Sequence, residues 1–100
     1  MAILTEEEFR KHLGTVFNAA TGESEIELTL VEVESYNPGP KEQSNMERFS
    51  AFFEGPRDPF VPQQNLHVHH PEMGEFDIFL VPVRGDDKGF RYEAVFNFYR

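Results

Sequence analysis

Residues 75–99 read EFDIFLVPVRGDDKGFRYEAVFNFY, and this stretch decides the fold. Alternate residues of a strand point to the same side, so Phe76, Ile78 and Leu80 share one face. Beyond the polar turn at 84–89, apolar residues again occupy every second position: Phe90, Tyr92, Ala94, Phe96 and Phe98. Period-two alternation on both sides of a turn rich in glycine and aspartate predicts a half-buried β-hairpin.

The segments before this hairpin also alternate. Residues 15–20 predict a brief strand, and residues 25–35 predict a longer one in which the alternation changes phase at Leu30–Val31. A one-residue slip turns every following side chain to the other face, so a β-bulge there would restore a single buried face. The alternative is a strand that passes from one face of the core to another.

Two further strands are separated by proline-rich chain. Residues 48–54 place Phe49, Ala51 and Phe53 on one face, and residues 65–70 form a short strand. The segment 55–64 carries three prolines, which lack the amide hydrogen of a sheet ladder, so we expect it to cross the surface. Residues 36–45 are a loop, and Pro82 predicts a sheet edge or a bulge.

The N-terminal sequence predicts a helix over residues 5–13. Thr5 can cap the amide of Glu8, the acidic residues lie in the first turn, and Gly14 follows the end. Phe9 and Leu13 would face the core, since a helix this short must pack on other structure. The predicted fold is α+β, with this helix packed on a mainly antiparallel, strongly curved five- or six-stranded sheet or small, partly closed barrel. The whole chain, residues 1–100, is predicted to be one domain.

Composition excludes several classes of function. The net charge of −9 argues against nucleic acid and anionic membranes as partners, because both attract basic surfaces. There is no cysteine, so a disulfide framework, a cysteine zinc site and a thiol nucleophile are excluded. We find no signal peptide or long apolar run, no nucleophile elbow and no phosphate loop. We therefore expect a cytoplasmic protein that is not an enzyme.

The histidines at 67–70 are the one cluster that could carry a metal. On a strand His67 and His69 share a face, and Glu72, Glu75 or Asp77 could add a carboxylate. They are weak candidates, because two strand histidines make an incomplete site. In the alternative interpretation Val68 points inward, the histidines face solvent, and His70 caps the turn before Pro71. We expect no metal and no cofactor.

The best candidate for a partner contact is the segment Phe60, Val61 and Pro62. Phe60 and Val61 stand between two prolines in a segment that cannot fully join the sheet. Held in a stiff loop, they would either plug the open end of the core or form an exposed anchor for a partner. Interfaces draw much of their energy from a few such residues. We expect a protein partner or self-association.

Several motifs resemble a family of small bacterial domains of unknown function, each about a hundred residues long. The shared pattern runs through FxGP, PQ, HPxxGxF, FLVPV and YEAVFN, at Phe53, Gly55, Pro56, Pro62, Gln63, His70, Pro71, Gly74, Phe76, Phe79 to Val83 and Tyr92 to Asn97. This resemblance, over about residues 49–97, implies a non-enzymatic structural or adaptor protein of a phage-tail-like or fibre-assembly system, in whose particle it would be incorporated. The alternative function is a β-barrel that binds a small ligand or a metal.

Overall fold

The computed structural model describes residues 5–21, 24–36, 46–57 and 61–99; for residues 46, 47, 98 and 99 only the backbone is described. This part of the chain forms one short helix and six strands. Their bounds are α1 Glu6–Lys11, β1 Val16–Ala20, β2 Glu25–Ser35, β3 Met46–Pro56, β4 Gln64–His70, β5 Gly74–Gly85 and β6 Gly89–Tyr99.

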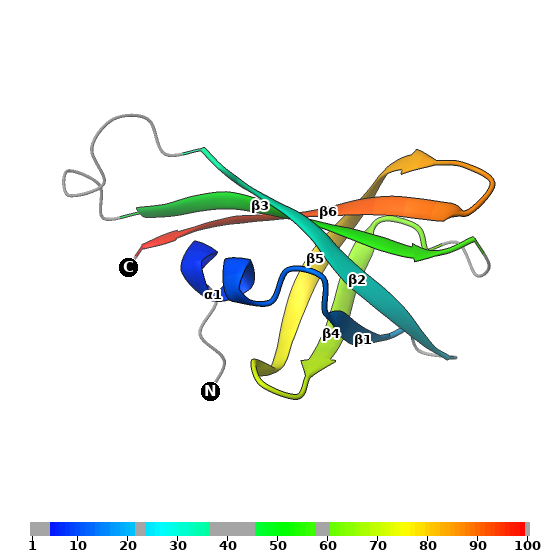
Figure 1. The fold of residues 1–100 in the computed structure, drawn as a ribbon, viewed down its shortest axis with the longest axis horizontal. Coiled ribbons are helices and arrows are strands. Elements are labelled where there is room, and N and C mark those ends of the chain that lie inside the picture. The colour runs from blue at the N-terminus through cyan, green and yellow to red at the C-terminus, as the bar shows by residue number, and fades with distance from the viewer. Residues whose placement is uncertain (1–4, 22–23, 37–45, 58–60, 100) are drawn as a thin grey trace.

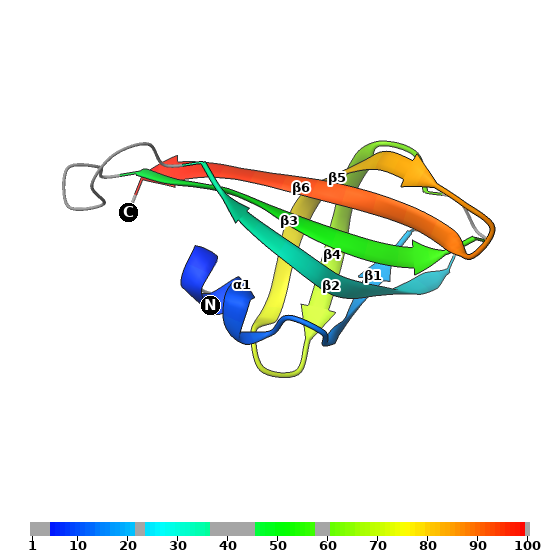
Figure 2. The same ribbon diagram turned by 45° about the horizontal axis from the view of Figure 1, so that its top comes forward.

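The six strands form a closed antiparallel barrel in the order β1-β2-β3-β6-β5-β4 (Figure 1). The ring closes where β1 meets β4, through Asn18 opposite His69, Ala19 opposite Val68 and Ala20 opposite His67. β3 and β6 pair along their whole length and extend beyond the ring as a long ribbon (Figure 2). The protein is therefore a small β-barrel with one helix, for which the expected α+β class is only a rough description.

Two irregularities bend the strands into this closed shape. The β2–β3 register shifts between Leu30 and Glu32, which confirms the bulge predicted from the change of phase. The β5–β6 register shifts between Pro82 and Arg84, so Pro82 lies at a bulge, as predicted. Bulges raise local twist and curvature, and curvature allows a small sheet to close.

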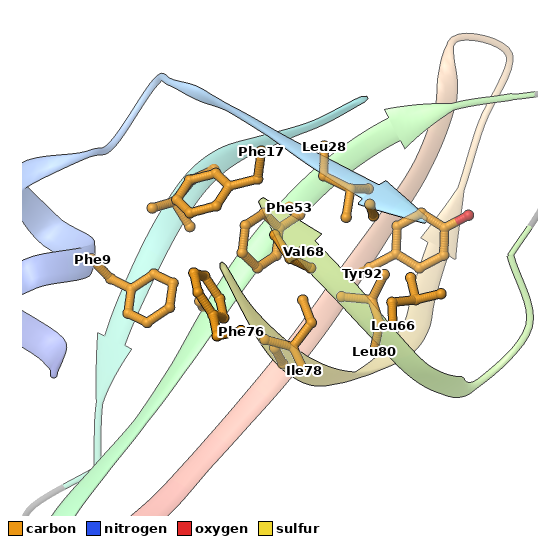
Figure 3. Close-up of a cluster of buried hydrophobic side chains, with 14 of the residues drawn as sticks. Phe9, Phe17, Leu28, Phe53, Leu66, Val68, Phe76, Ile78, Leu80 and Tyr92 are labelled. Carbon is orange, nitrogen blue, oxygen red and sulfur yellow. The ribbon is translucent and has the colours of Figure 1, made fainter. Parts of the chain in front are cut away.

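Aromatic side chains fill the interior of the barrel (Figure 3). Phe17, Phe53 and Tyr92 are completely buried, and the inward positions of β4 and β5 add Leu66, Val68, Phe76, Ile78 and Leu80. The predicted inward faces of the last hairpin are confirmed where side chains are described, except that Phe90 is only partly buried; the side chain of Phe98 lies outside the described residues. A buried ring contributes about 1.5–3 kcal/mol, so this core can hold a chain without disulfides.

The helix is shorter than predicted. Thr5 is the N-cap, and its side chain accepts a hydrogen bond from the amide of Glu8, as expected, but the helix ends at Lys11 rather than residue 13. Phe9 is fully buried as predicted, whereas Leu13 is 42% exposed. The prediction for Leu13 was wrong because His12 leaves the helical conformation and turns the next residue away from the core.

The start of the proline-rich segment also differs from the prediction. Gly55 and Pro56 belong to β3 and lie opposite Phe90 and Gly89 of β6. The single proline there is tolerated because it stands at the last position of its strand. No helix in the described part of the chain has the length and the apolarity needed to cross a membrane.

Candidate interaction surface

The outward face of β5 changes from acidic to apolar halfway along the strand. Glu75 and Asp77 point outward first, and the next outward positions are Phe79, Val81 and Val83. Phe79 is 46% exposed and Val83 is 47% exposed. On β6, Val95 is 60% exposed, and its neighbour Ala94 pairs with Leu80 of β5, so Val95 lies beside Phe79. We call Phe79, Val81, Val83 and Val95 the outer apolar strip.

Polar contacts fix the sheet around this strip. Glu93 of β6 lies opposite Val81, and its carboxylate accepts hydrogen bonds from the hydroxyls of Ser50 at 2.6 Å and Tyr36 at 3.3 Å. The guanidinium of Arg91 lies 4.8 Å from the centre of the Phe52 ring and pairs with Glu32. These contacts join β2, β3 and β6 on the outside, so the strip lies on a braced surface.

The β5–β6 turn is held by one aspartate. Asp86 accepts hydrogen bonds at its Oδ1 from the amides of Lys88 (2.8 Å) and Gly89 (3.2 Å). These two amide donors lower the pKa of Asp86 below its ordinary value. A cleft of about 310 Å³ lies beside this turn and is lined by Glu54, Arg84, Lys88, Phe90 and Arg91 among others. Its lining carries both acidic and basic side chains.

His67 lies on the outside of the barrel between two carboxylates. Its Nδ1 is 2.9 Å from Asp77 Oδ1, and its Nε2 is 2.8 Å from Glu75 Oε1. Both ring nitrogens can donate only in the imidazolium form, so these bonds with Glu75 and Asp77 raise the pKa of His67. The same bond lowers the pKa of Glu75. In the imidazolium form the His67 ring has no free lone pair for a metal.

His69 is also exposed on the outer face of β4, whereas Val68 between the two histidines is fully buried. Within residues 5–21, 24–36, 46–57 and 61–99, no group of three or more His, Asp or Glu side chains is arranged to hold a metal ion. The structure thus places the two weak metal candidates outside the barrel. A ligand bound inside the barrel would not reach either ring.

The predicted partner segment is divided by the structure. Val61 is 2% exposed, and its amide donates a hydrogen bond at 3.1 Å to the hydroxyl of Tyr92 in the core. Pro62 is exposed, and Phe60 lies outside the described residues. Val61 therefore takes the position of a plug rather than an anchor. A partner contact of Phe60 and Pro62 stays a prediction.

Comparison with known protein families identifies the family to which the chain belongs. A family model described as a domain of unknown function, DUF6916, matches residues 4–96. The chain belongs to this family. The match begins before α1 and ends within β6, so the family model covers nearly all of the barrel. No curated protein and no solved structure is significantly similar to the chain.

The DUF6916 barrel also contains a buried histidine network near α1. His70 is 3% exposed, and its ring lies 4.4 Å from the Phe17 ring and 4.7 Å from the His12 ring. Its Nδ1 accepts hydrogen bonds from the amides of Glu72 and Met73. His70 therefore caps the turn as predicted, but it is buried rather than facing solvent.

The hydrogens of this network can be assigned from the partners. Thr15 Oγ1 lies 2.6 Å from the carbonyl of His12, to which it must donate, and 3.0 Å from His70 Nε2, from which it must accept. Because Nδ1 accepts from two amides, His70 is neutral with its hydrogen on Nε2. Burial, followed by the nearby charge of His12, lowers the pKa of His70.

This lowered pKa predicts an acid-sensitive stability. The unfolded chain takes up a proton at His70 near pH 6.5 whereas the folded chain resists it, so the free energy of unfolding must fall as the pH drops below about 6.5. We expect this contribution to be fully present above that pH. His12, Glu72 and His69 lie near the ring and act on it through their charges, so the informative quantity is a difference between proteins.

Urea unfolding of the native protein and of His70→Asn between pH 7.5 and 5 measures this difference. The native protein should lose more stability over this range than the variant, although the variant is less stable at pH 7.5. Equal losses in both proteins would show that His70 takes up its proton as easily in the barrel as in the unfolded chain.

Sequence reasoning missed the outer apolar strip, although the signal was present. The run IFLVPV (78–83) is apolar at both odd and even positions. The hairpin interpretation used the even positions Ile78 and Leu80 for the core. It left Phe79, Val81 and Val83 unassigned. Apolar residues on both faces of a strand indicate that the outer face is also covered or in contact with a partner.

Proposed function

We propose that this chain is a non-enzymatic adaptor or structural protein that binds a protein partner through the outer apolar strip. The observation that carries the proposal is the row Phe79, Val81 and Val83 beside Val95 on the outside of β5 and β6. Single exposed apolar residues are ordinary, but a contiguous group marks an interaction site. The bracing of Glu93 by Ser50 and Tyr36 supports the proposal, since a rigid surface loses little entropy on binding.

The interior of the barrel supports a role on the outside. Barrels that carry a small ligand hold it among inward side chains, whereas here Phe17, Phe53 and Tyr92 occupy the interior and are completely buried. His67 and His69 point away from it (Figure 3 shows the inward residues Leu66 and Val68 of the same strand). The packing thus favours the adaptor over the ligand-binding barrel.

The rim of the strip suggests the chemistry of the partner. Glu75 and Asp77, which both hold His67, precede the strip on β5, Glu93 lies beside Val81, and Arg84 follows the strip opposite Arg91. A partner that places apolar side chains on the strip and basic side chains on these carboxylates would be complementary. We place such a partner among the structural proteins of a phage-tail-like or fibre-assembly system, the setting that the motif resemblance implies.

Affinity capture from an extract of the source organism tests the proposal. The native protein should retain a filament or particle protein, and the double variant Phe79→Ala/Val83→Ala should retain at least about tenfold less, because interface energy is concentrated in a few apolar residues. Leu13→Ala/Val16→Ala is the matched control, since both residues are exposed apolar side chains away from the strip. It should retain the partner fully. Equal retention by the two double variants would refute the strip as the binding surface.

A further inference from the structure

The C-terminal half of β6 has one free edge among the described residues. β5 pairs with β6 only from Leu80–Ala94 to Gly85–Phe90, and then leaves it to follow β4. From Phe96 to Tyr99, β6 pairs with β3 alone. Figure 2 shows this red strand along the border of the ribbon. α1 does not cover the edge, since its backbone approaches β2 and β3.

The backbone groups that face this edge can be identified from one hydrogen bond. The amide of Tyr36 donates to the carbonyl of Arg48 at 2.8 Å, so Arg48 of β3 turns its polar groups toward β2. Arg48 lies opposite Asn97, and in an antiparallel pair both residues then turn their amide and carbonyl away from each other. The N–H and C=O of Asn97 therefore point into the free edge, and those of Tyr99 do the same, whereas those of Val95 point toward Phe79, where β5 leaves the pair.

This edge lacks the features that normally prevent strand addition. Natural sheets guard free edges with charged residues, proline or bulges. Residues 95–99 read VFNFY, with no charge and no proline, and their pairing with β3 is regular. By contrast, the free stretch of β5 carries the outward carboxylates of Glu75 and Asp77. The free stretch of β5 is therefore protected against strand addition, whereas the free stretch of β6 is not.

We propose that two copies of this chain pair antiparallel through the free edges of their β6 strands, with the two-fold axis near Asn97. The charge distribution favours a second copy as the occupant. In a two-fold contact the same surface patch of both copies comes together. For a chain with net charge −9, most such contacts would bring acidic side chains close to acidic side chains and be repulsive. Residues 95–99 are all uncharged, so pairing through this stretch places no like charges opposite each other. The pairing would extend the β2–β3–β6 ribbon of both copies into one continuous sheet.

This inference goes beyond the adaptor function, because pairing of copies can be measured without any other partner. Asn97→Pro removes the amide that points into the edge and leaves the hydrogen bonds with β3 in place. Asn97→Ala is its matched control, since it removes the same side chain and keeps the amide. Sedimentation equilibrium and light scattering from micromolar to millimolar protein should give a dimer for the native protein and for Asn97→Ala. They should give a monomer for Asn97→Pro with an unchanged circular dichroism spectrum.

A second variant covers the case in which the proline disturbs the barrel. Val95→Lys changes an exposed side chain where the free edge begins and adds the charge with which natural edges are guarded. It should also be monomeric. A native protein that stays monomeric at millimolar concentration would overturn the proposal. A Val95→Lys or folded Asn97→Pro variant that remains as dimeric as the native protein would overturn it as well.

Discussion

Replacing Phe9 by alanine is expected to destabilise the folded chain by about 3–5 kcal/mol, the usual cost of removing a buried phenylalanine. The ring is completely buried, and its centre lies 5.1 Å from the Phe96 ring and 5.6 Å from the Phe49 ring. It also contacts Phe17 and Phe76 at 6.1 and 6.0 Å, so one side chain of α1 touches four strands of the barrel. Its loss leaves a cavity that rigid strands cannot close.

Equilibrium unfolding in urea gives this change in stability directly. Leu13→Ala is the control, because Leu13 belongs to the same N-terminal segment but is largely exposed; its cost should stay near or below about 1 kcal/mol. Similar costs for the two variants would mean that α1 is held by something other than the Phe9 contacts.

The second large effect is expected at Gly89, where β6 begins. A Cβ atom at this position would lie 2.2 Å from the carbonyl oxygen of Gly55, a distance that real Cβ atoms essentially never show. The obstacle is backbone in a paired strand, so it cannot rotate aside as a side chain can. Gly89→Ala should therefore destabilise the protein by about 1–3 kcal/mol, the range for overpacked sites.

Asp87, in the turn between β5 and β6, offers a matched control for Gly89. Asp87→Ala changes an exposed residue of the same turn and should alter the free energy of unfolding by no more than about 0.5 kcal/mol. Thermal and urea unfolding of both variants measure the difference. A Gly89→Ala protein as stable as Asp87→Ala would mean that the end of β3 does not lie against β6 at this point.

Much of the strand pattern could be predicted from the sequence because burial repeats every second residue. The inward faces at Phe49, Ala51 and Phe53 and at Phe76, Ile78 and Leu80 follow from that period alone. The bulges at Leu30 and Pro82 were also predictable, one from a change of phase and the other from the missing amide of proline. These are local properties, which a single sequence reports well.

Closure of the barrel was beyond local patterns. It depends on Ala19 meeting Val68, two residues almost fifty positions apart in the sequence. The end of the helix was missed for a related reason. The pattern that placed Leu13 beside Phe9 assumed another helical turn, whereas the chain leaves α1 at His12 to enter β1.

The candidate site was the least predictable part of the chain. The proline-framed segment drew attention to Val61, which the structure buries against Tyr92. The histidine pattern drew attention to His67, whose ring is held by Glu75 and Asp77. The outer apolar strip was overlooked because alternation identifies a buried face but does not tell whether the opposite apolar face is exposed.

The central claim is that the barrel is closed and filled inside and presents its apolar strip outside. Nuclear magnetic resonance of the methyl groups, with and without a soluble nitroxide, tests both parts at once. We expect strong broadening of Val83 and Val95, no broadening of Val68 and Leu80, and a nuclear Overhauser effect between Ala19 and Val68 where the ring closes. Shielded methyl groups at Val83 and Val95, or no contact between Ala19 and Val68, would contradict the account.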